Sequence, residues 1–70
     1  MKLHWTIWQP NEPAWDTTGR FRIHCGWKWS LTDIGVWPHF RIDGIKSIDK
    51  AKAMAQARAN VIRDRREVGQ

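Results

Sequence analysis

Three histidines and one cysteine are the residues of this 70-residue chain that could bind a metal or attack a substrate. His4, His24 and His39 are far apart, and none of them pairs with another ligand at the spacing of a metal-binding motif. His24 directly precedes Cys25, so in a strand the two side chains point to opposite faces. Cys25 also falls among apolar residues, which predicts a buried, inert thiol. We expect no metal site and no cofactor.

The acidic residues and the glycines offer no catalytic pattern either. Asp33 and Asp43 are typical of turns, and Asp49 is typical of the first turn of a helix. The glycines are scattered singly and never form a phosphate-binding loop. A chain of this length also leaves little room for a catalytic pocket. The sequence therefore indicates a binding protein rather than an enzyme.

The basic residues are the remaining candidates for a function. Twelve Lys and Arg against seven Asp and Glu give a net charge of +5 and a pI near 10.2, which favours a polyanionic partner. Alternation along the chain assigns at least four of the twelve Lys and Arg residues, together with two histidines, to one outward sheet face, with Trp37 or Trp8 available to stack on nucleobases. The predicted nucleic-acid-binding residues are Arg20, Arg22, His24, Lys28, His39, Arg41 and Trp37. The alternative reading is that such a face is simply the solvated side of a sheet.

Six tryptophans support a second class of function. Core positions account for Trp5, Trp27 and Trp29, whereas Trp8, Trp15 and Trp37 are candidates for an interface, because Trp and Arg are enriched at interaction hot spots. The alternative function is therefore a protein-interaction module that binds an acidic protein surface, or a homodimer.

An unbroken alternation of apolar and polar residues over positions 20–31 predicts one long strand, with Gly26 as a bulge or bend. Its inward residues would be Phe21, Ile23, Cys25, Trp27, Trp29 and Leu31. Shorter alternations predict strands at about 3–8 and 37–42. Residues 9–19 contain two prolines and predict a long loop carrying Trp15, and residues 32–35 predict a hairpin loop.

From Ser47 onward the apolar period changes to that of a helix, which we expect over about residues 47–65. Ser47 is the expected N-cap, and the inward stripe is Ile48, Ala51, Ala55, Ala59 and Ile62. Small residues on the helix would let it approach the large residues on the sheet. The predicted fold is α+β: one domain, residues 1–70, in which an antiparallel sheet of about three strands packs on one C-terminal amphipathic helix.

Two partial resemblances accompany these patterns. Gly44, Ile45, Lys46 and Ser47, followed by Ala51-Lys52, Ala55 and Ala59, resemble the closing strand and helix of double-stranded RNA-binding domains. The order of three strands and a helix is similar to small proteins encoded by bacteriophages and prophages, and to DNA-binding domains that lay a three-stranded sheet in the major groove. In those DNA-binding domains the implied site is the sheet face opposite the helix.

Cysteine content and hydropathy bear on location. A single cysteine cannot form an internal disulfide, and the first twenty residues lack the apolar run of a signal peptide. No segment approaches the roughly 18 consecutive apolar residues that span a bilayer. We expect a cytoplasmic protein without a membrane partner.

Overall fold

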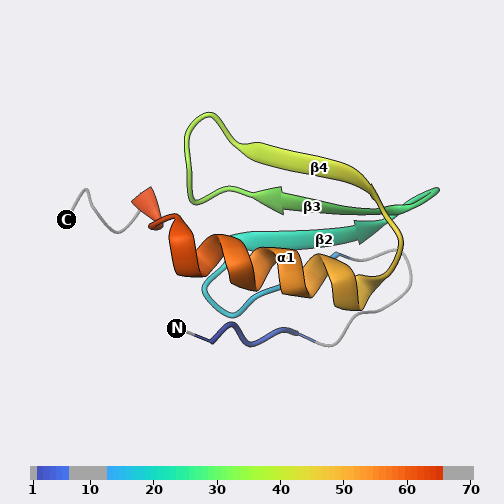
Figure 1. Cartoon of the computed structure of the whole chain (residues 1–70), viewed down its shortest axis with the longest axis horizontal. Coiled ribbons are helices and arrows are strands. Elements are labelled where there is room, and N and C mark those ends of the chain that lie inside the picture. Colours follow the sequence, from blue (N-terminus) through green and yellow to red (C-terminus); the bar gives the residue numbers. More distant parts are fainter. Residues whose placement is uncertain (1, 7–12, 66–70) are drawn as a thin grey trace.

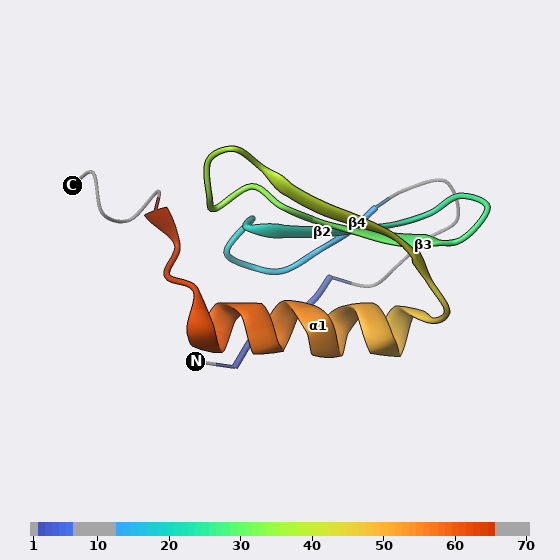
Figure 2. The same ribbon diagram turned by 45° about the horizontal axis from the view of Figure 1, so that its top comes forward.

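In the computed structural model, the chain forms a four-stranded antiparallel sheet with one helix across one of its faces (Figure 1). The structure describes residues 2–6 and 13–65. The elements are β1 (Ala14–Trp15), β2 (Phe21–Cys25), β3 (Trp29–Asp33), β4 (Phe40–Ile45) and α1 (Ile48–Val61), with the strands in the order β1-β2-β3-β4. Figure 2 shows the sheet and the helix as two layers. The predicted α+β class and the C-terminal helix are confirmed, but the sheet has four strands instead of about three.

The predicted long strand 20–31 is instead the β2–β3 hairpin. Cys25 pairs with Trp29, and the Gly26 amide donates to the Lys28 carbonyl at 3.1 Å, so residues 26–28 form the turn. A three-residue turn keeps odd-numbered residues of both strands on the same face, which is why the alternation continues through it. Phe21, Ile23 and Leu31 are buried as expected, but Cys25 and Trp27 are exposed, so their assignment to the core is wrong.

The N-terminal strand and the loop after it also differ from the prediction. Residues 2–6 make one bridge, Trp5 to Asp16, and the part of the expected strand at 7–8 lies outside the described residues, as do positions 9–12 of the loop. The other part of that loop contains β1, which pairs with β2 through Ala14–Ile23 and Trp15–Arg22. Buried Asp16 closes the β1–β2 turn by accepting from the Phe21 amide at 2.6 Å and from the hydroxyl of Thr18.

The last strand starts and ends later than predicted. Residues 37–39 belong to the β3–β4 connection, and β4 runs through the expected turn at Asp43-Gly44. The register slips there: Leu31 pairs with Ile42 but Trp29 pairs with Ile45, so β4 carries extra chain opposite Ser30. Gly44 has a φ of 77°, a left-handed backbone conformation that glycine adopts without strain. The irregularity returns Ile45 to the helix side, where it is buried.

The helix α1 is held by its cap and by its alanine stripe. The Ser47 side chain accepts from the Lys50 amide at 3.1 Å, which confirms the predicted N-cap. Ala51 and Ala55 are fully buried against Phe21, Ile23 and Leu31 in the core. The helix ends at Val61 rather than at about 65, because Ile62 is extended and its carbonyl accepts from Arg20 Nη1 at 2.9 Å.

The carboxylate of Asp33 is the most heavily bonded group in the described structure. It is fully buried, and it accepts from Arg20 Nε at 2.9 Å, Arg20 Nη2 at 3.0 Å, Arg58 Nε at 2.9 Å and the Gly35 amide at 2.9 Å. A Cβ at Gly35 would lie 2.7 Å from the Arg20 side chain, so this close approach requires glycine. The cluster joins the start of β2, the end of β3 and the helix. Asp33 thus stabilises the turn after β3, as the sequence predicts, by accepting from the Gly35 amide, and it also accepts from two buried or half-buried arginines that no local pattern indicates.

We predict that Ala55→Leu lowers the free energy of unfolding by about 1–3 kcal/mol, because the larger side chain has no space between α1 and the sheet. Urea denaturation followed by circular dichroism measures the change. The matched control is Ala53→Leu, which adds the same atoms at an exposed position of the same helix and should cost less than about 0.5 kcal/mol. Equal stability of the two variants would contradict the assignment of Ala55 to the core.

We predict that Asp33→Asn destabilises the protein by about 3–5 kcal/mol, because it leaves the guanidinium groups of Arg20 and Arg58 without a buried counter-charge. A core of this size rarely supplies more than about 3–5 kcal/mol, so most of the variant should be unfolded. The control is Asp43→Asn, which removes an exposed ion pair and should cost at most about 1 kcal/mol.

The pH dependence of wild-type stability is a second test of the role of Asp33. Burial raises the pKa of Asp33, but hydrogen bonds from Arg20, Arg58 and Gly35 outweigh it and hold the pKa below the ordinary 3.8. Because the pKa of Asp33 is lower in the folded than in the unfolded protein, the ionised carboxylate stabilises the fold. This stabilisation is complete above the unfolded-state pKa of 3.8, and it is lost as pH falls from there through the lower folded-state pKa. If the free energy of unfolding of the wild-type protein does not fall as pH is lowered below 3.8, the role given to Asp33 is contradicted.

Candidate nucleic-acid interface

The sheet face opposite the helix carries polar side chains from three strands. The register aligns Arg22 of β2, Thr32 of β3 and Arg41 of β4, and it aligns His24 with Ser30. An open pocket of about 550 Å³ lies on this side, at the end of the sheet nearest the β2–β3 turn. We call it the outer groove, and its lining residues are His24, Cys25, Gly26, Trp27, Lys28, Ser30, Arg41, Asp43 and Gly44.

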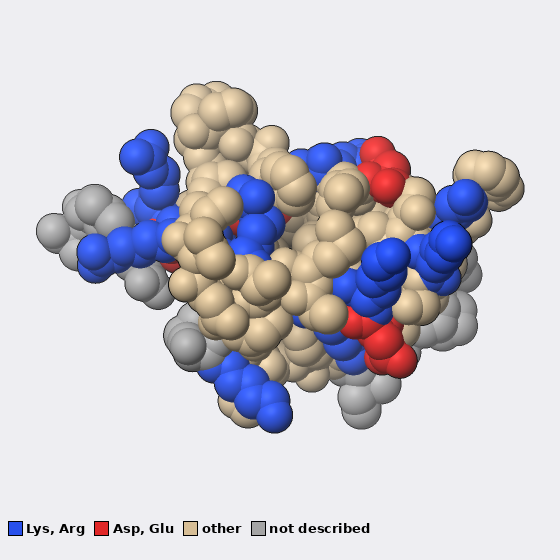
Figure 3. Space-filling view, viewed as in Figure 1, with Lys and Arg blue, Asp and Glu red and all other residues tan. Residues whose placement is uncertain are grey.

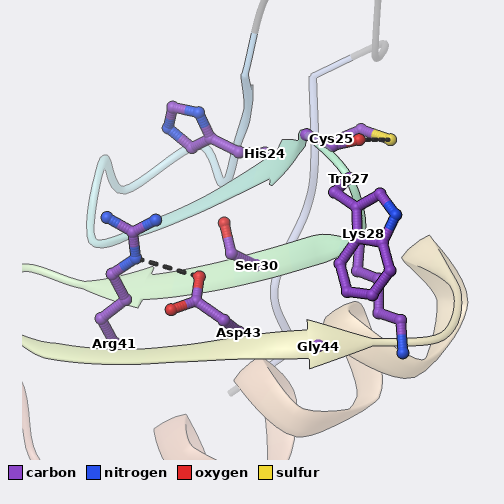
Figure 4. A pocket seen from close by; sticks show the side chains of 9 residues that line it. His24, Cys25, Trp27, Lys28, Ser30, Arg41, Asp43 and Gly44 are labelled. Atoms are coloured by element: carbon purple, nitrogen blue, oxygen red, sulfur yellow. Dashed lines mark hydrogen bonds and ion pairs between the residues drawn. The ribbon is translucent and has the colours of Figure 1, made fainter.

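The β2–β3 turn places an aromatic ring and a base at one end of the outer groove (Figure 4). Trp27 is 93% exposed, an unusual state for so large an apolar side chain. Lys28 Nζ lies 4.9 Å from the centroid of the Trp27 ring, within the range of a cation–π contact. The turn therefore presents a flat ring and a positive charge together.

An ion pair lies on the β4 side of the outer groove. Arg41 Nε donates to Asp43 Oδ1 at 3.2 Å, and both side chains are about two-thirds exposed, at 64% and 67%. Figure 4 shows both side chains on the same side of β4, with the hydroxyl of Ser30 beside them on β3. Asp43, which the sequence indicates as a turn residue, thus adds an acid to a predicted face that consists only of basic and aromatic residues. Its charge offsets the charge of Arg41.

His24 and Arg22 complete the polar face from β2. Both side chains are half-buried, and His24 Nε2 and Arg22 Nε have no hydrogen-bond partner among the described residues. The guanidinium carbon of Arg22 lies 5.5 Å from the ring centroid of Trp15, which holds this base against the sheet. Burial lowers the pKa of His24 below the ordinary 6.5, and the charges of Arg22 and Arg41 lower it further. A bound anion beside His24 would oppose these effects.

The structure brings together only part of the predicted site. Arg22, His24, Lys28 and Arg41 do share one side of the sheet. Arg20 does not, because it is 4% exposed and bonded to Asp33 on the helix side.

Trp37 and His39 also lie away from the outer groove. They form a T-shaped contact, with ring centroids 5.3 Å apart, in the β3–β4 connection. Together with Arg65 they line a second, shallower pocket of about 310 Å³. Trp37 is 77% exposed, as an interface candidate should be. Trp15 is half-buried, and Trp8 lies outside the described residues.

Three of the nine lining residues belong to the site predicted from the sequence, and the two missed residues that matter most for binding are Trp27 and Asp43. Trp27 was assigned to the core because the alternation continues through the turn, and Asp43 was assigned to a turn. One signal could have revealed the hairpin: an unbroken strand over residues 20–31 exceeds the usual strand length of about 3–10 residues, and Gly26 marks a natural break.

The surface charge is not confined to the outer groove. Figure 3 shows Lys and Arg side chains in several places on the helix side as well, with acidic side chains next to some of them. Within residues 2–6 and 13–65, no group of three or more His, Cys, Asp or Glu is placed to hold a metal ion. In the same part of the chain, no helix combines the length and apolarity needed to cross a membrane.

Comparison of the chain with protein-family models, with curated proteins and with solved structures found no match. The geometry of the outer groove is therefore the basis on which a function can be assigned.

We predict that Arg41→Ala raises the pKa of His24 toward 6.5, because it removes one of the positive charges that disfavour protonation of the ring. Titration of the His24 ring protons by NMR measures this directly. Lys50→Ala removes an equal charge from an exposed position on α1 and should leave the titration of His24 unchanged. A His24 pKa that is unchanged or lower in Arg41→Ala would contradict the proximity of these two groups.

Proposed function

We propose that this protein binds nucleic acid without catalysing a reaction, and that the outer groove is its binding surface. The observation that carries the proposal is that one pocket brings together an exposed indole and exposed basic side chains: Trp27 and Lys28 of the β2–β3 turn and Arg41 of β4. Arg41 is fixed by strand pairing, and the Gly26–Lys28 backbone hydrogen bond closes the short turn that carries Trp27 and Lys28, so little entropy is lost when these groups engage a ligand. The proposed residues are those of the predicted site that share this face, with Trp27 in the place of Trp37.

Phosphate contacts would come from the side chains at the rim of the outer groove. Lys28 and Arg41 reach solvent, and each can donate to phosphate oxygens while its neighbours remain in place. Arg22 adds a positive charge from within the sheet, next to Trp15. An overall charge of +5 strengthens attraction to a polyanion at long range. Binding of this kind weakens steeply with salt.

A protein partner is the second candidate, and Trp37 favours it. This exposed indole lies with His39 in the β3–β4 connection, away from the outer groove. Exposed Trp is typical of interaction hot spots, and nearby bases would suit an acidic protein surface or a second copy of the chain. A nucleic-acid partner is preferred to a protein partner because Trp27 shares its pocket with two basic side chains, those of Lys28 and Arg41.

The resemblance to double-stranded RNA-binding domains contributes no contact residues to this proposal. Ser47 caps α1, and Ala51 and Ala55 are buried in the core, so these matching positions have packing roles. The resemblance to phage-encoded proteins and to sheet-based DNA-binding domains agrees with the use of the face opposite the helix, as an analogy of architecture only. A cytoplasmic location stays a prediction from the sequence.

We expect the protein to bind labelled single-stranded DNA, duplex DNA or double-stranded RNA with micromolar affinity at about 50 mM salt, and to lose affinity toward about 200 mM. Lys28→Ala/Arg41→Ala should weaken binding about tenfold and reduce the salt slope by about 2. Fluorescence anisotropy measures both quantities.

The control is Lys50→Ala/Arg63→Ala, which has the same net charge but changes exposed bases outside the outer groove. It should retain most of the affinity. Absence of binding to all three nucleic acids at low salt would overturn the proposal and leave a protein partner as the better candidate. An equal loss of affinity in both double variants would show that the net positive charge of the protein, and not the outer groove, determines binding.

A further inference from the structure

The outer groove contains an acid where a phosphate-binding surface would be expected to contain none. Asp43 lines the pocket together with Arg41, and their contact uses the Oδ1 oxygen of the carboxylate. A carboxylate repels phosphate, but it accepts hydrogen bonds from the ring N–H and amino groups of nucleobases. The position of Asp43 is therefore better suited to a base than to the backbone of a nucleic acid.

The groove also has the shape that a flat ring requires. Trp27 offers an exposed indole at one end, and Gly26 and Gly44 contribute walls without side chains. A Cβ built at either glycine would have no atom within 4 Å, so the space beside both positions is open. The volume of about 550 Å³ lies within the usual range of small-ligand pockets, which is roughly 300–1,000 Å³.

Building on the proposed function, we infer that the outer groove binds a single-stranded nucleic acid by stacking one base on Trp27 and reading its edge with Asp43, with guanine preferred. Guanine is the base that presents two adjacent donors, N1–H and the N2 amino group, on its Watson–Crick edge, and a carboxylate can accept from both. Thymine and uracil present one donor between two carbonyl oxygens, which the carboxylate repels. Lys28 and Arg22 remain to contact phosphates on either side.

A duplex cannot use the groove in this way. Its bases are stacked on both faces, and their Watson–Crick edges are paired, so neither Trp27 nor Asp43 could reach them. A single strand leaves both the ring faces and the edges open. The exposure of Trp27 therefore distinguishes this binding mode from a purely electrostatic grip on a double helix.

The test measures binding of four ligands. Three are single strands of about twelve nucleotides: oligothymidine, the same strand with one central guanine, and the same strand with one central hypoxanthine. The fourth is the duplex of such a strand with its complement. We expect the guanine strand to bind about tenfold more tightly than oligothymidine, with hypoxanthine between them because it lacks the N2 amino group. Trp27→Ala should weaken binding of both strands about tenfold, and Trp37→Ala, which changes another exposed indole outside the groove, should not.

The edge-reading role is tested by Asp43→Asn, which keeps the size of the side chain but replaces one acceptor with a donor. It should abolish the preference for guanine without weakening the binding of oligothymidine. If duplex DNA binds as tightly as the single strand and Trp27→Ala has no effect, or if Asp43→Asn keeps the guanine preference, this inference is overturned while the proposed function stands. If none of these nucleic acids binds, both fail.

Discussion

The buried carboxylate of Asp33 is the constraint on which the rest of the structure depends. An ionised carboxylate in the interior is tolerated only when donors surround it, and here Arg20, Arg58 and the Gly35 amide supply four hydrogen bonds. Those donors come from the entry to β2, from the helix and from the β3–β4 connection. The same Arg20 also holds the Ile62 carbonyl, where α1 ends. One charge thus fixes the position of the helix over the sheet, which the small apolar core alone would hold only weakly.

This arrangement separates the bases of the chain by function. Arg20 and Arg58 are used within the fold, and Arg58 also lies 3.7 Å from the ring centroid of Phe40. The basic residues described on the other side of the sheet form no buried ion pair: Arg22 lies against Trp15, Lys28 lies against Trp27, and Arg41 pairs with Asp43 at the surface. Because α1 covers one face only, the opposite face keeps its charged groups and Trp27 in reach of a ligand. The net positive charge alone does not reveal this division.

The sequence predicts local features of this fold far better than long-range ones. The Ser47 cap and the buried alanines of α1 follow from helical periodicity, and the inward positions of Phe21, Ile23 and Leu31 follow from alternation. Alternation fails at the β2–β3 turn, because a three-residue turn preserves the parity of the pattern on both sides. No local sequence pattern predicts the ion pair between Arg20 and Asp33, since it depends on how the strands pair. For this reason four of the seven residues of the predicted face share one side of the sheet, whereas Arg20, Trp37 and His39 lie elsewhere.

The most direct test of the open sheet face as the binding surface is NMR chemical-shift mapping. The backbone amide signals of the isotope-labelled protein are followed while an unlabelled single strand containing guanine is added. We expect the changes to fall on residues 24–30 and 41–44, which border the outer groove, while the amides of α1 and of the β3–β4 connection keep their positions. Changes centred on α1 or on residues 34–39 would contradict a binding surface on the open face of the sheet.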